Sequence, residues 1–510
     1  MHTNASSDGF STLRSWMFPV YKNELKKVLP LGIMMILISF NFWLLHISKD
    51  TLVISAKHSG AEIINFLKIP IFVASIFLVM IFTWISNKLE QKTIFFIIVG
   101  AFFGFFLFFN YVIYPNKDAF HLFSSEELVD LQMRYPWFKW MFPVISYWSY
   151  SLFYIMSELW GAFVLSLLFW QFANQITTVE QSRRFYMLLG MFNGIGTIIS
   201  GFFITNYEAK ADRYLADAYG SKLHNLLLVF CVSCLIILII YYWTHKAIVK
   251  SSELYKLSNT SKNTKNKIKL SFVESFKYIL RSRYMGYIAL ISIAYNISIN
   301  FVEVTWKSQV KDLYQDPLAI ESYFSQITIY MGFLIFFIGF FGAGFVRRFS
   351  WRCSALITPI VMTITAILFF VVTLWQESFG VVAQLISMTP IAFAVWVGQI
   401  HNLSSRSCKY SFFAATREMA FIPLDAELKV KGKAAVDILS GRVGKFGGSV
   451  TQSLLLSIPS LATQFAIAPY LLGFVLIVCV VWVISINLLN KEFLKVAYGS
   501  ATADPGVEKS

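Results

Sequence analysis

Long apolar runs recur along almost the whole chain and constrain its fold more than any other feature. Each is close to 20 residues, the length that an α-helix needs to cross the ~30 Å hydrocarbon core of a bilayer. Because a bilayer offers no water to unpaired backbone groups, such runs fold as helices. The runs predict twelve spans, at residues 29–48, 64–86, 94–114, 141–173, 184–206, 224–243, 284–305, 327–347, 352–373, 379–402, 435–458 and 463–489. The fourth is long for one crossing, so we expect it to be tilted or to extend beyond the bilayer.

The composition supports the same class. Only 14% of the 510 residues are charged, whereas soluble proteins carry about 25%. We therefore predict an all-α polytopic membrane protein. Cys231 and Cys234 have the spacing of a redox or metal pair, but they lie in an apolar span without further ligands. We interpret them as small lipid-facing residues, and we expect no metal and no cofactor.

The basic residues indicate the orientation. A net charge of +15 would suggest nucleic acid as the partner of a soluble protein. Here the cations gather in loops on one side of the predicted membrane: the N-terminal residues, the segment 244–283, and the short loop with Arg347, Arg348 and Arg352. Loops 115–140 and 207–223 balance bases with acids. Because basic loops stay in the cytoplasm, both termini are predicted to be cytoplasmic, and no nucleic acid is expected.

The basic segment 244–283 divides the spans into six and six. We predict a cytoplasmic N-terminal segment, two six-helix bundles joined by a linker, and a cytoplasmic tail, at 1–28, 29–243, 244–283, 284–489 and 490–510. Glycine-rich sequences recur in the fifth span (GMFNGIGTIISG) and the eleventh (GRVGKFGGSV). A 6+6 duplication favours a major-facilitator-like arrangement with cargo bound between the halves. Nothing demands a partner chain, so we expect a monomer.

The stretch 417–448 indicates the charge of the cargo. It begins as a charged loop and enters an apolar span that still carries Asp437, Arg442 and Lys445. An ionisable side chain near the bilayer centre costs about 2.5–3.5 kcal/mol or more, so cations there need a function. Glycines around Lys445 leave room for a neighbouring helix or a ligand. A cationic pocket in a membrane suggests an anionic cargo.

Other spans also carry charges. Glu158 lies deep in the fourth span, where it is either a proton or cation site or the partner of a buried lysine. Lys68 lies early in the second span, as a cargo ligand or as a lysine that reaches the interface. Glu303 and Lys307 are four residues apart, so they share a helix face and can pair, either in the cargo site or as a salt bridge at the rim.

Polar and aromatic residues of the fourth span could recognise a base. Asn174 carries an amide that either reads a base edge or caps the span. Tyr147 and Tyr154 precede Glu158, and one of them could stack on a purine, although packing or an interfacial belt is the commoner role for each such residue.

No enzyme motif is present in the sequence. Leu439 and Phe446 stand where a phosphate-binding loop around Lys445 would need glycine and serine or threonine. No Ser/His/Asp or zinc arrangement stands out among seven histidines. We therefore expect a transporter driven by a gradient or by exchange, and not an ATP-hydrolysing pump.

Several long blocks resemble a known family. They are SKDTLVISAK (48–57), GAEIINFLK (60–68), SELWGAFVLSLLFWQFANQITT (157–178), FVEVTWK (301–307) and GRVGKFGGS (441–449). These blocks resemble the ATP/ADP translocases, the nucleotide transporters of obligate intracellular bacteria and plastids, and the likeness covers about residues 15–490. It implies twelve spans and nucleotide cargo (ATP, ADP, GTP, UTP or CTP), moved by ATP/ADP antiport or by nucleotide–proton symport. The family's important charges would correspond to Lys68, Glu158, Glu303 and Lys445, with Lys49 as an alternative for the first.

One departure from the family pattern bears on the transport mode. Strict ATP/ADP exchangers resemble Asn-Tyr-Thr-Ile-Leu-Arg-Asp-Thr-Lys-Asp where this chain has residues 41–50, and the Arg-Asp pair is His46-Ile47 here. This departure speaks against strict ATP/ADP exchange. The stretches YWSYSLFYIMSELW (147–160) and GRVGKFGG (441–448) look closer to chlamydial-type members that import nucleotides for biosynthesis, some driven by protons. The absence of a transit peptide favours a bacterial inner membrane.

We hypothesise that Lys68 and Lys445, with Lys49, Arg442 and Lys307, hold the phosphates. Glu158 or Glu303 would neutralise the lysines of the empty carrier, and in a symporter would also carry the proton. The alternatives are a strict ATP/ADP antiporter, a transporter of another phosphorylated anion such as NAD, and a membrane scaffold without transport.

Overall fold

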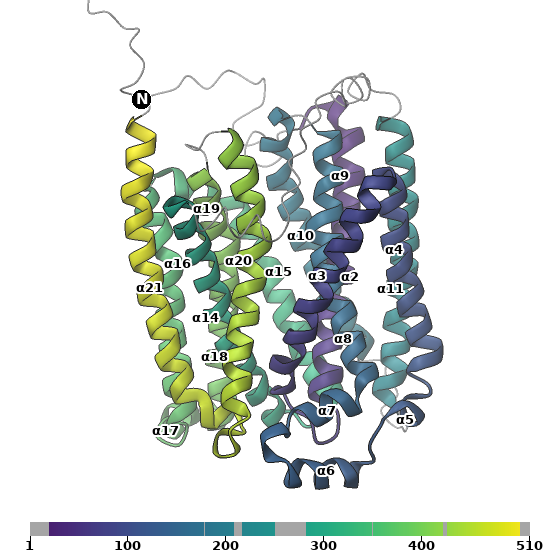
Figure 1. Cartoon of the computed structure of the whole chain (residues 1–510), viewed down its shortest axis with the longest axis vertical. Helices are drawn as coiled ribbons and strands as arrows, with labels where there is room; N and C mark the ends of the chain where they lie inside the picture. The colour runs from purple at the N-terminus through teal and green to yellow at the C-terminus, as the bar shows by residue number, and fades with distance from the viewer. Residues whose placement is uncertain are drawn as a thin grey trace, which may run out of the picture.

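The chain folds into one bundle of long helices (Figure 1). The computed structural model describes residues 20–177, 179–208, 217–249, 282–348, 350–421 and 426–499, and there is no strand among them. Most of the predicted linker and the ends of the predicted terminal segments lie outside these ranges. We use "N-terminal half" for residues 20–249 and "C-terminal half" for residues 282–499.

The N-terminal half contains α2 (Leu25–Ile54), α3 (Ile63–Lys88), α4 (Gln91–Phe108), α5 (Lys117–Phe120), α6 (Ser125–Arg134), α7 (Met141–Ser146), α8 (Trp148–Trp160), α9 (Phe169–Ile176), α10 (Val179–Glu208) and α11 (Ala218–Thr244). A π-helical segment, η4 (Gly161–Leu168), joins α8 to α9. The C-terminal half contains α14 (Arg283–Leu313), α15 (Pro317–Arg348), α16 (Trp351–Leu374), α17 (Gly380–Leu385), α18 (Pro390–Cys408), α19 (Ala414–Phe421), α20 (Ala426–Leu456) and α21 (Gln464–Gly499).

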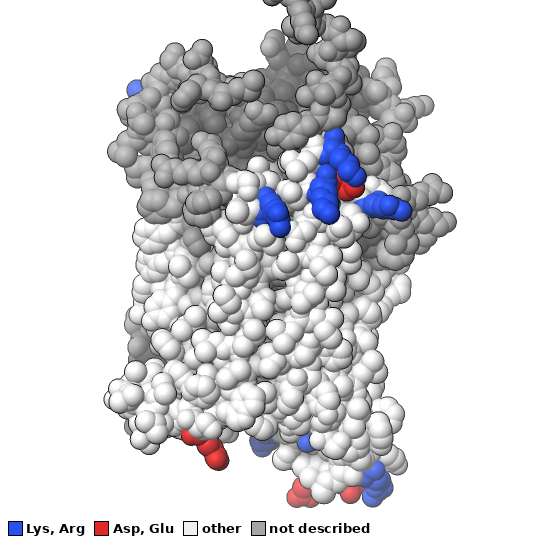
Figure 2. Space-filling view, turned by 90° about the vertical axis from the view of Figure 1, so that its left-hand side faces the viewer, with Lys and Arg blue, Asp and Glu red and all other residues white. Residues whose placement is uncertain are grey.

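The predicted membrane class is confirmed. Ten helical stretches within the described residues are long and apolar enough to cross a bilayer. The remaining two predicted spans correspond to α18 and α20, which are helical but carry more polar residues. Figure 2 shows the surface that this produces: charged residues gather towards the two ends, and a broad uncharged band lies between them. The chain is therefore a multi-pass membrane protein.

Two predicted spans are interrupted. In the fourth, Tyr147 leaves helical geometry between α7 and α8, with φ −93° and ψ 45°. In the tenth, Ser387 has φ 57°, and α18 begins afterwards at Pro390, capped by the Thr389 side chain. Proline in the first turn and threonine at the cap are standard helix starts. Hydropathy measures the length of an apolar run, so it does not detect a break of one or a few residues.

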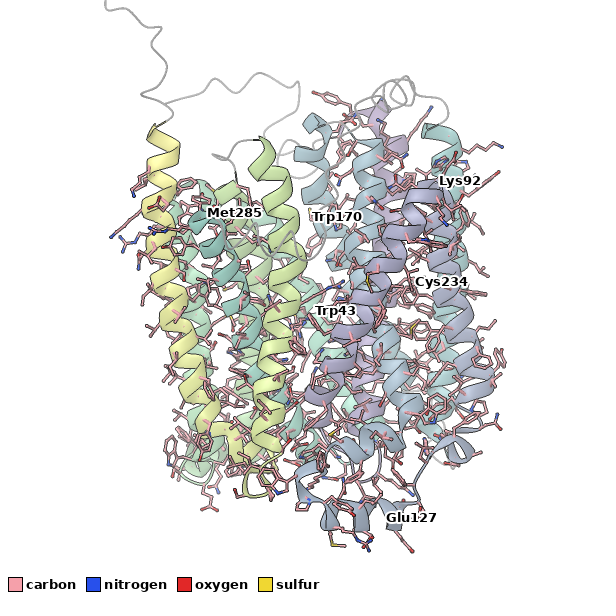
Figure 3. All side chains as sticks on the ribbon, in the orientation of Figure 1. Trp43, Lys92, Glu127, Trp170, Cys234 and Met285 are labelled. Atoms are coloured by element: carbon pink, nitrogen blue, oxygen red, sulfur yellow. The ribbon has the colours of Figure 1, made fainter. Side chains whose placement is uncertain are left out.

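Two further expectations need correction. The stretch from residue 417 was predicted to begin as a loop, but α19 and α20 make residues 414–421 and 426–434 helical, and residues 422–425 lie outside the described ranges. Ala, Glu, Leu and Lys favour helix, and a helix can continue beyond the bilayer. Cys231 and Cys234 do not face lipid: both are buried, and the Asn41 amide donates to the Cys234 sulfur at 3.7 Å. Figure 3 places Cys234 inside the N-terminal half.

The closest approach between the halves is the crossing of α10 and α15. A Cβ atom added to Gly332 on α15 would lie 2.8 Å from the Ile198 backbone nitrogen and 3.0 Å from the Gly194 carbonyl oxygen on α10. A Cβ added to Gly201 would lie 2.7 Å from the Ser325 carbonyl oxygen. Only glycine permits these two backbones to touch.

Polar contacts also join the halves towards the end that carries α6 and α17, the lower end in Figure 1. Lys222 on α11 and Glu321 on α15 form an ion pair at 2.8 Å, and both side chains are fully buried. The Ser48 hydroxyl donates to the same carboxylate at 3.3 Å. In the loop before α3, Glu62 accepts hydrogen bonds from the Gln464 backbone and the Ser308 hydroxyl. These contacts hold the lower end of the bundle together.

We predict that Gly332→Ala lowers the free energy of unfolding by about 1–3 kcal/mol, the usual cost of overpacking a core. The added methyl group meets backbone atoms, which cannot rotate away. Gly100→Ala on α4 is the matched control, because a Cβ there meets no atom within 4 Å. Thermal unfolding of both variants in detergent measures the effect, and equal midpoints would contradict the close crossing.

Candidate functional site

A continuous series of ion pairs crosses from one half to the other. In the N-terminal half, Glu158 on α8 accepts from Lys68 on α3 at 3.2 Å and lies 3.1 Å from the Lys49 amine on α2. Lys49 also donates to Asp50, the next residue, at 2.7 Å. We call these residues, with the three described next, the charge network.

Asp50 carries the series into the C-terminal half. Its second carboxylate oxygen lies 2.9 Å from the Lys307 amine on α14. Lys307 also donates to Glu303 at 2.8 Å, one helical turn away. The Arg406 guanidinium on α18 closes the series at 2.9 Å from the same Glu303 oxygen. Five helices thus meet through side-chain charges.

The centre of the charge network is almost completely buried, and its outer members are 12–20% exposed. The side chains of Lys49 and Asp50 are 1% and 2% exposed, and that of Lys307 is 6% exposed. Separating one such charge from its partners costs several kcal/mol, so every member needs at least one opposite charge in contact. The four cations outnumber the three carboxylates, which leaves one positive charge uncompensated within the series.

Aromatic rings lie close to three of the four cations of the network. The Lys49 amine lies 3.9 Å from the centre of the Tyr154 ring, and the Lys68 amine lies 5.6 Å from it. The Arg406 guanidinium lies 5.8 Å from the Trp43 ring. Figure 3 shows Trp43 between the two groups of helices. Cations over ring faces gain up to about 2 kcal/mol when they are desolvated.

A small cavity of about 40 Å³ adjoins the network between the halves. Its walls include Asp50, Glu303, Lys307 and Arg406 from the network and the indole rings of Trp43 and Trp306. His46 and Ile47, the two residues at which the sequence departs from the family pattern, also line it. The His46 ring nitrogen lies 3.6 Å from Asp50. The cavity is therefore lined by two cations, two carboxylates and aromatic rings.

The structure brings six of the predicted site residues together. Lys49, Lys68, Glu158, Glu303 and Lys307 belong to the charge network, and Tyr154 lies against it. Glu303 pairs with Lys307, as their spacing allows, and Glu158 contacts two buried lysines, which is one of the two roles expected for it. That these residues bind or couple cargo stays a prediction.

Lys445 and Arg442 form no ion pair with the network among the described residues. The Lys445 side chain is exposed on α20, near enough for its charge to act on Lys68 and Glu158. The Arg442 guanidinium lies 5.9 Å from the Phe163 ring. Gly444 and Gly448 let α20 pack closely on Asn296 and Asn300 of α14. The glycines that surround Lys445 thus serve helix packing on one face.

Two predicted base-recognition residues lie away from the network. Asn174 is exposed near the end of α9, sixteen residues beyond Glu158, which is roughly 24 Å along a helix. Tyr147 lies at the break before α8, where its hydroxyl donates to the Lys57 carbonyl and its ring stacks on Tyr150. Their role in base recognition stays a prediction.

Two members of the network were missed by sequence reasoning. Asp50 follows Lys49 directly and was read only as part of a block, although it joins the two halves. Arg406 lies four residues beyond the predicted tenth span and was treated as outside it, whereas α18 continues to Cys408. Following that helix for one more turn would have found Arg406.

Solved structures with the same architecture are membrane transporters. The chain aligns with a bacterial homologue of the iron transporter ferroportin in an inward-facing state, at a TM-score of 0.56 and 14% identity, over 92% of this chain and 99% of that one. It aligns with a D-xylose–proton symporter at a TM-score of 0.52 and 11% identity, over 91% and 97%. At these identities the likeness shows the fold alone, which is the predicted major-facilitator-like arrangement.

Sequence comparison gives the family. The family model for the TLC ATP/ADP transporter matches residues 3–493. ADP,ATP carrier protein 1 of Chlamydia trachomatis is 39% identical over 96% of this chain and 93% of its own length. ADP,ATP carrier protein 1 of Rickettsia bellii is 37% identical over 97% and 98%. The chain belongs to the TLC ATP/ADP transporter family, as the sequence blocks predicted.

We predict that Asp50 and Lys307 are energetically coupled. Asp50→Asn removes one carboxylate contact from Lys49 and one from Lys307, so it should destabilise the protein. In a double-mutant cycle with Lys307→Met, the two effects should differ from additivity by about 0.5–3 kcal/mol. The cycle is measured by thermal unfolding in detergent.

The control cycle combines Asp50→Asn with Lys117→Met, whose amine pairs with Asp217 at a separate site. That pair of changes should add within about 0.5 kcal/mol. Additivity in both cycles would show that the Asp50–Lys307 contact contributes nothing to stability.

Proposed function

We propose that the protein is a secondary active transporter that imports nucleoside triphosphates across a bacterial inner membrane by alternating access, through nucleotide–proton symport or nucleotide exchange. The observation that carries this proposal is the buried charge network, which joins the halves and places Lys307 and Arg406 in the wall of a cavity between them. An anionic cargo needs cations inside the membrane to bind to. Isolated cations there are unstable, so they need carboxylate partners such as those of the charge network. Family membership, and relatives that are named ADP,ATP carriers, support nucleotides as the cargo.

The phosphates bind by replacing carboxylates. In the empty carrier, Glu158 and Glu303 each neutralise two cations. An arriving triphosphate offers oxygens of the same kind to Lys49, Lys68 and Lys307, with Lys445 and Arg442 as further cations from α20. The carboxylates that lose their partners can then take up a proton, so one of them would be the coupling site of a symporter.

In alternating access, a movement of the two halves opens the cargo site first to one side of the membrane and then to the other. The two six-helix bundles, residues 29–243 and 284–489, would rock about the network as units. The crossing of α10 with α15 and the contacts of Glu62 and Glu321 support closure of the lower end. With both termini in the cytoplasm, as the basic loops predict, that end faces outwards and the site opens inwards. A monomer suffices for this movement.

The primary experiment is uptake of labelled ATP, GTP, UTP, CTP and NAD into proteoliposomes, with and without preloaded nucleotide and a protonophore. Uptake that needs internal nucleotide and ignores the protonophore indicates exchange. Uptake into empty vesicles that collapses with the proton gradient indicates symport. Competition by NAD alone would indicate another phosphorylated cargo, and failure to move any nucleotide would refute the proposal.

We predict that Lys445→Ala weakens ATP binding at least about tenfold. A hydrogen bond to a charged group contributes about 1.5–3 kcal/mol, and 1.4 kcal/mol is tenfold in affinity. Lys495→Ala is the control, because this exposed lysine pairs only locally, with Glu492 near the end of α21. Equal affinity in the two variants, measured by calorimetry in detergent, would remove Lys445 from the site.

A further inference from the structure

A stacked pair of aromatic rings joins the two halves beside the charge network. Phe72 on α3 and Phe446 on α20 have ring centroids 4.5 Å apart and planes inclined by 22°. Within the part of the chain that the structure describes, it is the only pair of stacked or edge-on aromatic rings with one ring from each half. Both side chains are half-buried. Such a pair contributes about 0.5–1.5 kcal/mol beyond its buried area.

The pair lies between the cations of the proposed phosphate site. Phe72 follows Lys68 by four residues, so the two side chains occupy one face of α3, one turn apart. Phe446 directly follows Lys445 and lies one turn beyond Arg442 on α20. Four residues rise about 6 Å along a helix axis, which is within the reach of a nucleotide from its phosphates to its base.

We propose that the transported nucleotide inserts its base between Phe72 and Phe446. The inference rests on the proposed function and names the base subsite of the same cargo. Each stacking contact between a base and an aromatic side chain contributes about 1–3 kcal/mol, and every base offers two faces. The base thus replaces one ring–ring contact with two base–ring contacts.

Insertion couples base binding to movement of the halves. Carbon atoms in contact lie about 3.5–4.0 Å apart, so a base between the rings requires them to separate to about 7 Å. Because Phe72 and Phe446 belong to different halves, α3 and α20 must part by a few ångströms at this level. Below the rings, the Asn65 amide donates to Gln452 at 3.3 Å, which joins the same two helices. The bound base therefore becomes a bridge between the halves.

The tyrosines of the fourth span are less suited to this role. The Lys49 amine covers one face of Tyr154, and Tyr147 stacks on Tyr150 away from the network. The phenylalanine rings carry no hydrogen-bonding group, so they read the face of a base and not its edge. The subsite accordingly discriminates weakly among ATP, GTP, UTP and CTP, with larger purines bound more tightly by their area.

The test compares ATP with tripolyphosphate, which lacks a base. In purified protein, Phe72→Leu and Phe446→Leu keep apolar volume but remove the ring, and each should weaken ATP binding about five- to a hundredfold. Tripolyphosphate affinity should stay unchanged, and Phe446→Tyr should restore ATP binding. The matched control is Phe77→Leu on the same helix, where the ring is 57% exposed on the surface.

A second readout locates the base directly. ATP with an azide on the base should, on illumination, label α3 or α20 next to these rings in wild-type protein. Unchanged ATP affinity in both leucine variants, or labelling confined to the fourth span, would overturn the base subsite while leaving nucleotide transport in place. Failure of wild-type protein to bind ATP while it binds tripolyphosphate would overturn the subsite and exclude nucleotides as cargo.

Discussion

The pairing of buried charges is the constraint on which the rest of this structure depends. A lone lysine or carboxylate inside a bilayer is costly, and a well-placed partner offsets that cost. Here each carboxylate of the charge network contacts two cations. Asp50 forms ion pairs with two lysines, and Glu303 forms ion pairs with a lysine and an arginine. Moving any one of five helices therefore disturbs charges on the others.

The same groups serve stability and cargo binding in the proposed mechanism. A ligand changes a conformational equilibrium only through contacts that differ between the states. Phosphate oxygens that take cations from Glu158 and Glu303 alter the contacts between α2, α3, α8, α14 and α18 together. A base between Phe72 and Phe446 alters the contact between α3 and α20. Cargo thereby acts on both halves, while the ion pair of Lys222 with Glu321 joins them at the lower end.

The candidate site was partly predictable because some of its geometry is local. Glu303 and Lys307 share a helix face by their spacing alone, and Glu158 lies too deep to reach water without a partner. Asp50 gave no such signal, since its bond to Lys307 joins residues 257 positions apart. Arg406 was missed because the predicted tenth span ended at residue 402, about one turn before it. Phe72 and Phe446 are two phenylalanines among 51, and only the fold brings them together.

The sequence by itself determined the all-α membrane class, the approximate positions of most of the long helices, and the family. Apolar length and the residue order within the blocks are properties of consecutive residues, so no contact is needed to recognise them. Tertiary structure decided which charges neutralise one another, where the fourth and tenth segments break, and that Cys231 and Cys234 face the interior. These features depend on how helices far apart in the chain pack, because each contact joins residues whose spacing in the sequence carries no periodic signal.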